Sequence, residues 1–164
     1  MDNLYKLRSY KEDDLNFVRN SWAKSYYKGA GFIDYLTPKE FNEIHRPIRE
    51  TTLNKENIAC IIACSNQDEN LILGWILIEK PIEDGIILHY LYVKEAFKGE
   101  KISYELIKRA LPNRPIYVSH MTDMAMKIMK RKAEFFKEFY VSNNPIMIRD
   151  RLNFLRRKKD VSDT

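Results

Sequence analysis

Three consecutive apolar runs rich in β-branched and aromatic residues occupy the middle of this 164-residue chain, at 58–65, 71–79 and 86–93. The segments between them, 66–70 and 83–85, are short and polar. β-Branched and aromatic residues favour strands, and short polar connections join antiparallel neighbours. The sequence therefore predicts an antiparallel meander of three strands at the centre of the fold.

Helical periodicity comes before this meander. Residues 5–8 alternate briefly and predict a first strand, and apolar residues then recur at helical spacing over 15–26. The sequence Thr-Pro-Lys-Glu at 37–40 supplies an N-cap, a proline at the first helical position and an acid at the third. We expect a second helix over 38–52, with Pro47 as the point where it could be interrupted.

Helical periodicity returns after the meander. A helix is expected from Gly99 to the residue before Pro112, followed by a short strand at 116–119, a helix over 122–136 and an edge strand at 145–148. The predicted order is β-α-α-β-β-β-α-β-α-β. This order gives an α/β (α+β) fold with a mixed, mostly antiparallel sheet and helices on both faces.

Length and composition predict one domain over residues 1–150 and a basic tail over 151–164. A 45% hydrophobic content is enough for one core. No apolar run reaches the roughly 18 to 20 residues that a membrane span needs, and the first residues lack a secretory signal. We therefore expect a cytoplasmic protein without a membrane partner.

The basic end of the chain leaves two interpretations open. The formal net charge is +5, and the arginines and lysines of 149–159 account for much of the excess. Such a segment is typical of a solvated tail, or it binds an acidic partner or nucleic acid.

Several chemistries lack motif support. The sequence contains no Walker loop, zinc-protease signature, nucleophile elbow or Cys-x-x-Cys pair. Cys60 and Cys64 fall on one predicted strand, on the same face and about 13 Å apart, which is too far for a disulfide. We expect them in the core, and we expect no metal site.

Residues 89–103 combine the end of a strand, a tight turn and the start of a helix. This arrangement directs unpaired backbone N–H groups and the positive end of a helix toward one point. It is a suitable site for a pyrophosphate group.

This segment resembles the cofactor motif of the GNAT acyl-coenzyme A transferases. That motif is a strand ending in valine, an aromatic residue, and then Gln/Arg-x-x-Gly-x-Gly/Ala opening a helix. Here it corresponds to Val93, Phe97 and the segment 98–103. The resemblance implies that the third and fourth strands splay apart near Tyr92 and that acetyl-coenzyme A fills the gap. The implied cofactor-binding residues are Leu91, Tyr92, Val93, Lys98, Gly99, Glu100, Lys101, Ile102 and Ser103.

Three positions depart from that motif. Lys98 replaces the first Gln or Arg, Lys101 the central glycine, and Ser103 the final Gly or Ala. Lys101 places a long side chain where the backbone normally approaches phosphate. Two interpretations stay open: its ammonium pairs with a phosphate, or its side chain fills the crevice and prevents binding.

The resemblance also indicates a catalytic pair. His89 is a candidate base, expected to alternate with Leu91 and Val93 on its strand, and Tyr140 is a candidate acid for the leaving thiolate. A buried structural histidine and an aromatic cover for the sheet are the alternative roles. His120 ends a strand, where a cap or turn role is expected and a chemical role is the alternative, and His45 is expected at the surface.

The leading functional hypothesis is an N-acetyltransferase that moves an acetyl group from acetyl-coenzyme A to an amine of a small molecule or protein. The alternative is a catalytically silent GNAT-like module that acts through a protein or nucleic-acid partner. The Lys, Ile and Asn content suggests an AT-rich genome, such as that of a phage or bacterium. The resemblance implies a homodimer.

Overall fold

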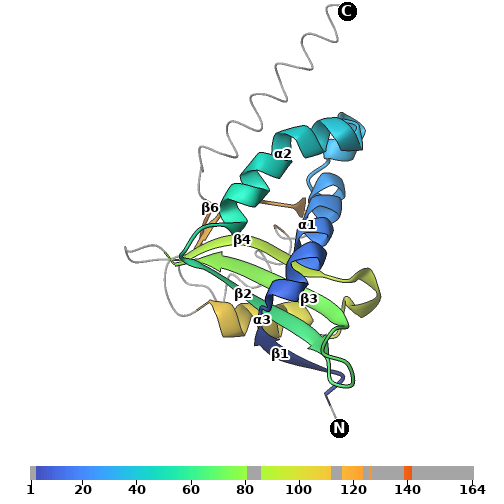
Figure 1. Ribbon diagram of the computed structural model, residues 1–164, viewed down its shortest axis with the longest axis vertical. Coiled ribbons are helices and arrows are strands. Elements are labelled where there is room, and N and C mark those ends of the chain that lie inside the picture. The colour runs from blue at the N-terminus through green and yellow to red at the C-terminus, as the bar shows by residue number, and fades with distance from the viewer. Residues whose placement is uncertain (1–2, 81–85, 112–115, 124–125, 127–138, 142–164) are drawn as a thin grey trace, which may run out of the picture.

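The computed structural model describes residues 3–80, 86–111, 116–123 and 126, and the backbone of 139–141. Its elements are connected in an order close to the predicted one (Figure 1). In chain order they are β1 (Tyr5–Ser9), η1 (Glu12–Asp14), α1 (Leu15–Gly29), η2 (Phe32–Asp34), α2 (Pro38–Leu53), β2 (Ile58–Ser65), β3 (Ile72–Glu79), β4 (Ile86–Val93), η3 (Glu95–Phe97), α3 (Ile102–Ala110), β5 (Ile116–Val118) and β6 (Phe139–Val141).

A single sheet of six strands runs in the order β1-β2-β3-β4-β5-β6. Neighbours from β1 to β4 pair antiparallel, which confirms the predicted meander, whereas β5 and β6 are added in parallel. β6 was not predicted. The strand expected at 145–148, most of the helix expected over 122–136 and the basic tail lie outside the described residues.

The sheet separates two apolar cores. α1 and α2 lie against one face of the sheet and α3 lies against the other (Figure 1). Trp22 of α1 and Trp75 of β3 are fully buried in the first core, and Leu106 of α3 and Ile76 of β3 are fully buried in the second. The alternation of β3 side chains between the two cores makes it the most enclosed strand of the described sheet.

The predicted start of α2 is confirmed in detail. Thr37 Oγ1 accepts the N–H of Glu40, and the Glu40 carboxylate accepts the N–H of Thr37 at 2.8 Å, which completes a capping box. The expected interruption at Pro47 is wrong, because α2 continues through it. Pro47 lies on the exposed side of the helix, where water can satisfy the carbonyl that loses its N–H partner.

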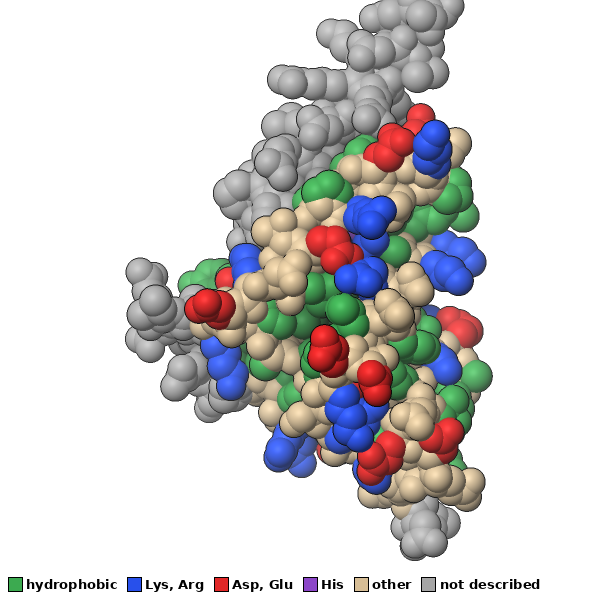
Figure 2. Space-filling model, in the orientation of Figure 1, with side chains coloured by type: hydrophobic (Ala, Val, Ile, Leu, Met, Phe, Trp, Pro, Cys, Tyr) green, Lys and Arg blue, Asp and Glu red, His purple; other side chains and the backbone are tan. Residues whose placement is uncertain are grey.

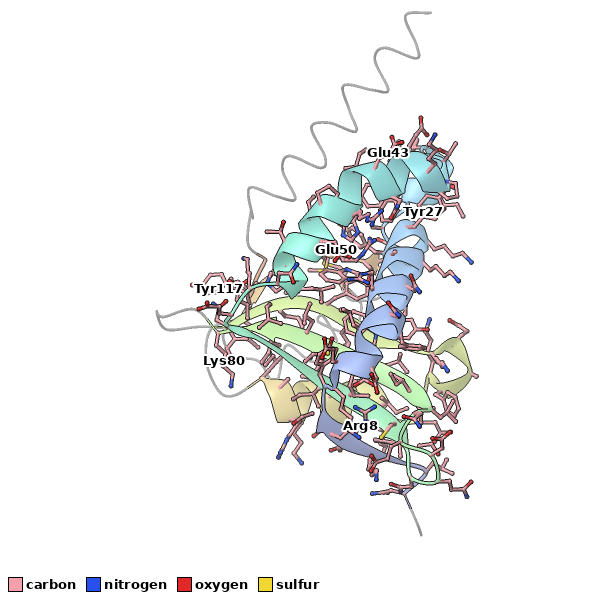
Figure 3. All side chains as sticks on the ribbon, in the orientation of Figure 1. Arg8, Tyr27, Glu43, Glu50, Lys80 and Tyr117 are labelled. Atoms are coloured by element: carbon pink, nitrogen blue, oxygen red, sulfur yellow. The ribbon has the colours of Figure 1, made fainter. Side chains whose placement is uncertain are left out.

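An ion pair joins the two helices that share a face of the sheet. Arg19 of α1 donates from Nη2 to Glu50 Oε2 of α2 at 2.9 Å, and Glu50 lies between the two helices (Figure 3). Both side chains are about one-third exposed, so this ion pair contributes little to stability, and its main effect is to orient the two helices. Among the described residues, no helix combines the length and the apolar character that crossing a bilayer requires.

Gly74 of β3 occupies a point where the sheet has no room for a side chain. A Cβ built there would lie 2.7 Å from the carbonyl oxygen of Tyr92, and 3.3 Å from side-chain atoms of Val93 and Ile102. The first of these contacts is with backbone, so β4 itself would have to shift.

We expect Gly74→Ala to lower the free energy of unfolding by roughly 1–3 kcal/mol, because the new methyl group overpacks this point. Urea denaturation measures the change. Gly29→Ala is the matched control, since its Cβ would meet only side-chain atoms of Thr122, at 3.2 Å. Equal losses in the two variants would contradict a clash specific to the β4 backbone.

Candidate functional site

β5 pairs with only the first part of β4, from Ile86 to Leu88. Their parallel pairing ends at Leu88 and Val118, and Ser119 N–H donates to Leu88 O at 3.1 Å just beyond it. β4 continues to Val93 while still paired with β3. The prediction that the third and fourth strands splay was therefore wrong, since β3 and β4 stay paired through Gly74 and Val93, and the gap opens on the other side of β4.

A pocket of about 500 Å³ lies beside this free part of β4. All of the predicted cofactor residues except Glu100 and Lys101 line it. The opposite wall comes from the end of α1 and from the segment after β5. The lining residues are Ser25, Lys28, Gly29, Tyr90, Leu91, Tyr92, Val93, Glu95, Phe97, Lys98, Gly99, Ile102, Ser103 and Thr122.

The turn between β4 and α3 supplies hydrogen-bond donors at this pocket. Gly99 adopts a positive φ of 100°, and the first intrahelical bond of α3 runs from Glu105 N–H to Lys101 O at 3.0 Å. The N–H groups of the first helical turn have no acceptor within a helix. Ile102 and Ser103 belong to that turn and line the pocket, so this end of the pocket suits an anionic group.

Lys101 occupies the left-handed region, with φ 60° and ψ 10°, at the N-cap of α3. This is the backbone conformation that glycine adopts most easily. Its side chain is exposed and lines a separate hollow that also includes Tyr5, Lys6 and Glu105. The side chain does not fill the pocket, and its pairing with a phosphate stays a prediction.

Positive charge and neutral tyrosines characterise the pocket wall. Lys28 and Lys98 line it, and Lys98 forms an ion pair with Glu95 at 2.5 Å. Tyr90 shares a hydrogen bond of 2.9 Å with Ser25, and burial raises the pKa of Tyr90 to about 12. Burial also raises the pKa of Tyr92. Both phenols are therefore protonated near neutral pH.

His89 does not line the pocket. Leu77 pairs with Tyr90 and Ile78 pairs with Leu88, so His89 is the additional residue of a β-bulge. The expected alternation with Leu91 and Val93 was wrong. Those two residues pack on the α3 side of the sheet. His89 lies on the α1 side, beside His120, which contacts Trp22.

Both ring nitrogens of His89 are engaged. Nδ1 lies 2.6 Å from Ser119 Oγ, Nε2 lies 2.5 Å from Glu79 Oε2, and the residue is 2% exposed. Burial lowers the pKa of His89, although the hydrogen bond to Glu79 opposes this shift. Its catalytic role stays a prediction, and direct contact with a substrate in the pocket would require the ring to move.

Tyr140 lies on β6, where its backbone is paired with Tyr117 of β5. Its side chain and the basic segment 149–159 lie outside the described residues. The proposed acid and the proposed nucleic-acid contact therefore stay predictions.

The three histidines of the chain form one buried group. His45 is 1% exposed and His120 is 3% exposed, and their ring centroids lie 5.3 Å apart, while His89 and His120 are 6.2 Å apart. No histidine surface is visible on the face drawn in Figure 2. The surface position expected for His45 was wrong. The helical spacing of Phe41, His45, Ile48 and Thr52, all buried on α2, was the signal that could have revealed it.

Burial shapes the titration of this group. Burial and the nearby Arg49 guanidinium lower the pKa of His45 to about 3. Burial, together with the other two histidines, holds the pKa of His120 well below its ordinary value. All three rings are therefore neutral in the folded protein near pH 7.

Solved structures show which fold this is. No protein-family model and no curated protein matches the chain. A candidate acetyltransferase from Bacillus subtilis, YycN, is similar, with a TM-score of 0.63 and 13% identity over 84% of this chain and 95% of that one. A candidate acetyltransferase from Pyrococcus furiosus has a TM-score of 0.57 and 15% identity over 91% of each chain. A GNAT-family acetyltransferase from Staphylococcus aureus has a TM-score of 0.56 and 14% identity over 80% and 82%. The chain has the GNAT fold.

We expect Lys101→Gly to raise the free energy of unfolding by up to about 1 kcal/mol, because glycine removes the cost of a left-handed L-residue. Its greater freedom in the unfolded chain offsets part of this gain. Glu100→Gly is the matched control, because Lys101 alone among the described non-glycine residues has a positive φ, and this variant should lose stability. A loss in both variants, measured by urea denaturation, would contradict strain at Lys101.

Acid should destabilise the fold through the three histidines. Their folded-state pKa values lie below the ordinary 6.5, so between these values the unfolded chain binds more protons. The contribution is complete above pH 6.5 and is lost as the pH falls toward the folded-state pKa values. Between pH 7.5 and 5 we expect urea denaturation to show a loss of about 2 kcal/mol from His45, whose folded-state pKa is about 3, and further losses from His120 and His89. A flat profile over this range, which lies above most carboxylate titration, would rule out the neutral buried group.

Proposed function

We propose that the protein is an N-acetyltransferase that binds acetyl-coenzyme A in the pocket between β4 and α3 and passes the acetyl group to an amine of a small molecule or protein. The observation that carries this proposal is the coincidence of the pocket with the predicted cofactor segment. The GNAT fold agrees with it.

Two features of the pocket fit the cofactor. The first turn of α3 offers N–H groups for phosphates, and Lys28 lies nearby as a counter-charge. Lys98 would add a second positive charge on leaving its ion pair with Glu95. Leu91, Tyr92 and Val93 lie on a strand edge that β5 has left, and such an edge can hydrogen-bond an extended chain carrying amide groups. The pantetheine arm of coenzyme A is such a chain.

In the proposed reaction the amine lone pair attacks the thioester carbonyl carbon, and the carbon–sulfur bond then breaks. The amine loses one proton and the thiolate gains one, so the site needs an acceptor and a donor. Tyr90 and Tyr92 are protonated phenols that line the pocket, and they join Tyr140 as candidate donors. His89 stays the candidate acceptor only through a movement that opens its enclosed ring.

One observation favours a second candidate, a protein that binds the cofactor or a partner without transfer. His89, the base indicated by the sequence, is 2% exposed and has both nitrogens engaged. This enclosure of the candidate base fits a GNAT-like module that binds without transferring an acetyl group.

Calorimetry with acetyl-coenzyme A tests the proposal. We expect saturable binding at micromolar levels, and Ser103→Glu should weaken it at least tenfold, or by about 1.4 kcal/mol, because a carboxylate would stand where phosphates bind. Lys39→Gln is the matched control, since it makes the same change in net charge at an exposed side chain of α2 that does not line the pocket. It should weaken binding less.

Two results would separate the candidates. Binding accompanied by amine-dependent release of free thiol supports the transferase, and binding without release over a panel of amines supports the silent module. Absence of binding, or equal weakening in the two variants, would overturn the assignment of this pocket to the cofactor.

A further inference from the structure

Three buried ring nitrogens under α1 and α2 have no hydrogen-bond partner, namely Trp22 Nε1, His45 Nε2 and His120 Nε2. Their rings contact one another pairwise, with centroids 5.2 to 5.7 Å apart and planes at 76° to 80°. Leaving a buried polar group unpaired costs free energy, because the group gives up its hydrogen bonds to water. Because the three rings are mutual neighbours, one shared partner is the simplest way to satisfy all three groups.

The direction of the surrounding hydrogen bonds fixes what that partner must be. Glu79 accepts from Lys55 Nζ at 3.1 Å and lies 2.5 Å from His89 Nε2. Burial opposes its charge, but the hydrogen bonds from His89 and Lys55 hold the pKa of Glu79 below its ordinary value. An ionised carboxylate only accepts, so His89 carries its proton on Nε2 and has a lone pair on Nδ1.

The Ser119 hydroxyl connects His89 to His120 and determines which nitrogen of His120 carries the proton. Its hydroxyl has one proton and lies 2.6 Å from His89 Nδ1 and 2.8 Å from His120 Nδ1. Because the hydroxyl donates to the lone pair of His89, it must accept from His120. Neutral His120 therefore carries its proton on Nδ1, and its unpartnered Nε2 is an acceptor.

The other two unpartnered nitrogens are donors. Arg49 Nη1 lies 2.9 Å from His45 Nδ1, and a guanidinium can only donate, so neutral His45 carries its proton on Nε2. The indole of Trp22 is a donor only. The three rings thus present two N–H groups and one lone pair.

We propose that Trp22, His45 and His120 hold one internal water molecule, which accepts from the first two and donates to the third. Water matches this set because its oxygen accepts two hydrogen bonds while donating another, and buried waters commonly make about three. Two N–H donors repel a cation, and no described His, Cys, Asp or Glu side chains form a group that could hold a metal ion. The lone pair of His120 repels an anion.

The enclosure of the site favours water over a hydroxyl group of a larger ligand. The three side chains are between 0 and 3% exposed, and none of them lines the cofactor pocket. The water would form the end of a chain that continues through His120, Ser119 and His89 to Glu79. This inference does not depend on acetyl transfer.

Long-range proton–nitrogen correlation spectra of the full chain, labelled with ¹⁵N in histidine at pH 7.5, test the hydrogen-bond direction. We expect neutral rings with the proton on Nε2 in His45 and His89, and on Nδ1 in His120. A proton on Nε2 of His120, or a charged ring among the three, overturns the proposal.

Ser119 variants show whether the relay sets the tautomer. Ser119→Ala removes the acceptor for His120 Nδ1–H while keeping both rings. Only the water would then hold the proton on Nδ1, so the fraction of His120 with its proton on Nδ1 should fall. Ser119→Thr keeps the hydroxyl and should keep the tautomer. Equal fractions of the Nδ1–H tautomer in Ser119→Ala and Ser119→Thr overturn the assignment of the relay.

A crystal structure that resolves ordered water tests the ligand itself. We expect one oxygen within hydrogen-bond distance of Trp22 Nε1, His45 Nε2 and His120 Nε2. The same three nitrogens with no oxygen between them, or with another ligand, would refute the water site whatever the tautomers.

Discussion

One additional residue in β4 determines the layout of both the core and the pocket. His89 is inserted between Leu88 and Tyr90, which pair with successive residues of β3. Every later residue of β4 therefore points to the opposite face of the sheet from the one that regular alternation would give. Tyr90 and Tyr92 then lie under α1, and Leu91 and Val93 lie over α3. The same stretch of β4 is not paired with β5, so residues that point to either face of the sheet line one pocket.

The polar group beside the bulge is unusual for an aromatic core. His45 and His120 are surrounded by rings, with Tyr26 centroids 4.9 and 5.1 Å away, and these neighbours exclude bulk water. Aromatic packing alone would not satisfy the ring nitrogens. Arg49 pairs with one ring nitrogen of His45, and Ser119 pairs with one of His120. Both ring nitrogens of His89 are paired, with Ser119 and Glu79. Such a group fixes side-chain orientation more strictly than apolar packing does, and it is sensitive to any change in proton number.

Local patterns in the sequence were sufficient for most elements. The capping box at Thr37 and the meander follow from short-range rules, and the structure confirms them. The bulge at His89 could not be predicted, because an extra strand residue leaves the pattern of residue types unchanged. The unpaired end of β4 could not be predicted either, because it depends on where β5, a strand distant in the sequence, ends. For the candidate site, the pocket residues of 91–103 were foreseen largely from the strand–turn–helix pattern, whereas the enclosure of His89 follows from the contacts of Glu79 and Ser119.

The core and the pocket share one connecting segment. Ser119 and His120 are held by the buried relay, and Thr122, which follows them closely in the chain, lines the pocket and lies against Gly29 at the end of α1. A change in the hydrogen bonds of His120 would therefore reach the pocket wall through a short piece of backbone. The wall opposite, at Lys98 to Ser103, is anchored separately, by α3 and by the Lys94 N–H to Leu73 O bond of 2.8 Å. The two sides of the pocket thus depend on different cores, and protonation of the histidines would disturb the α1 side first.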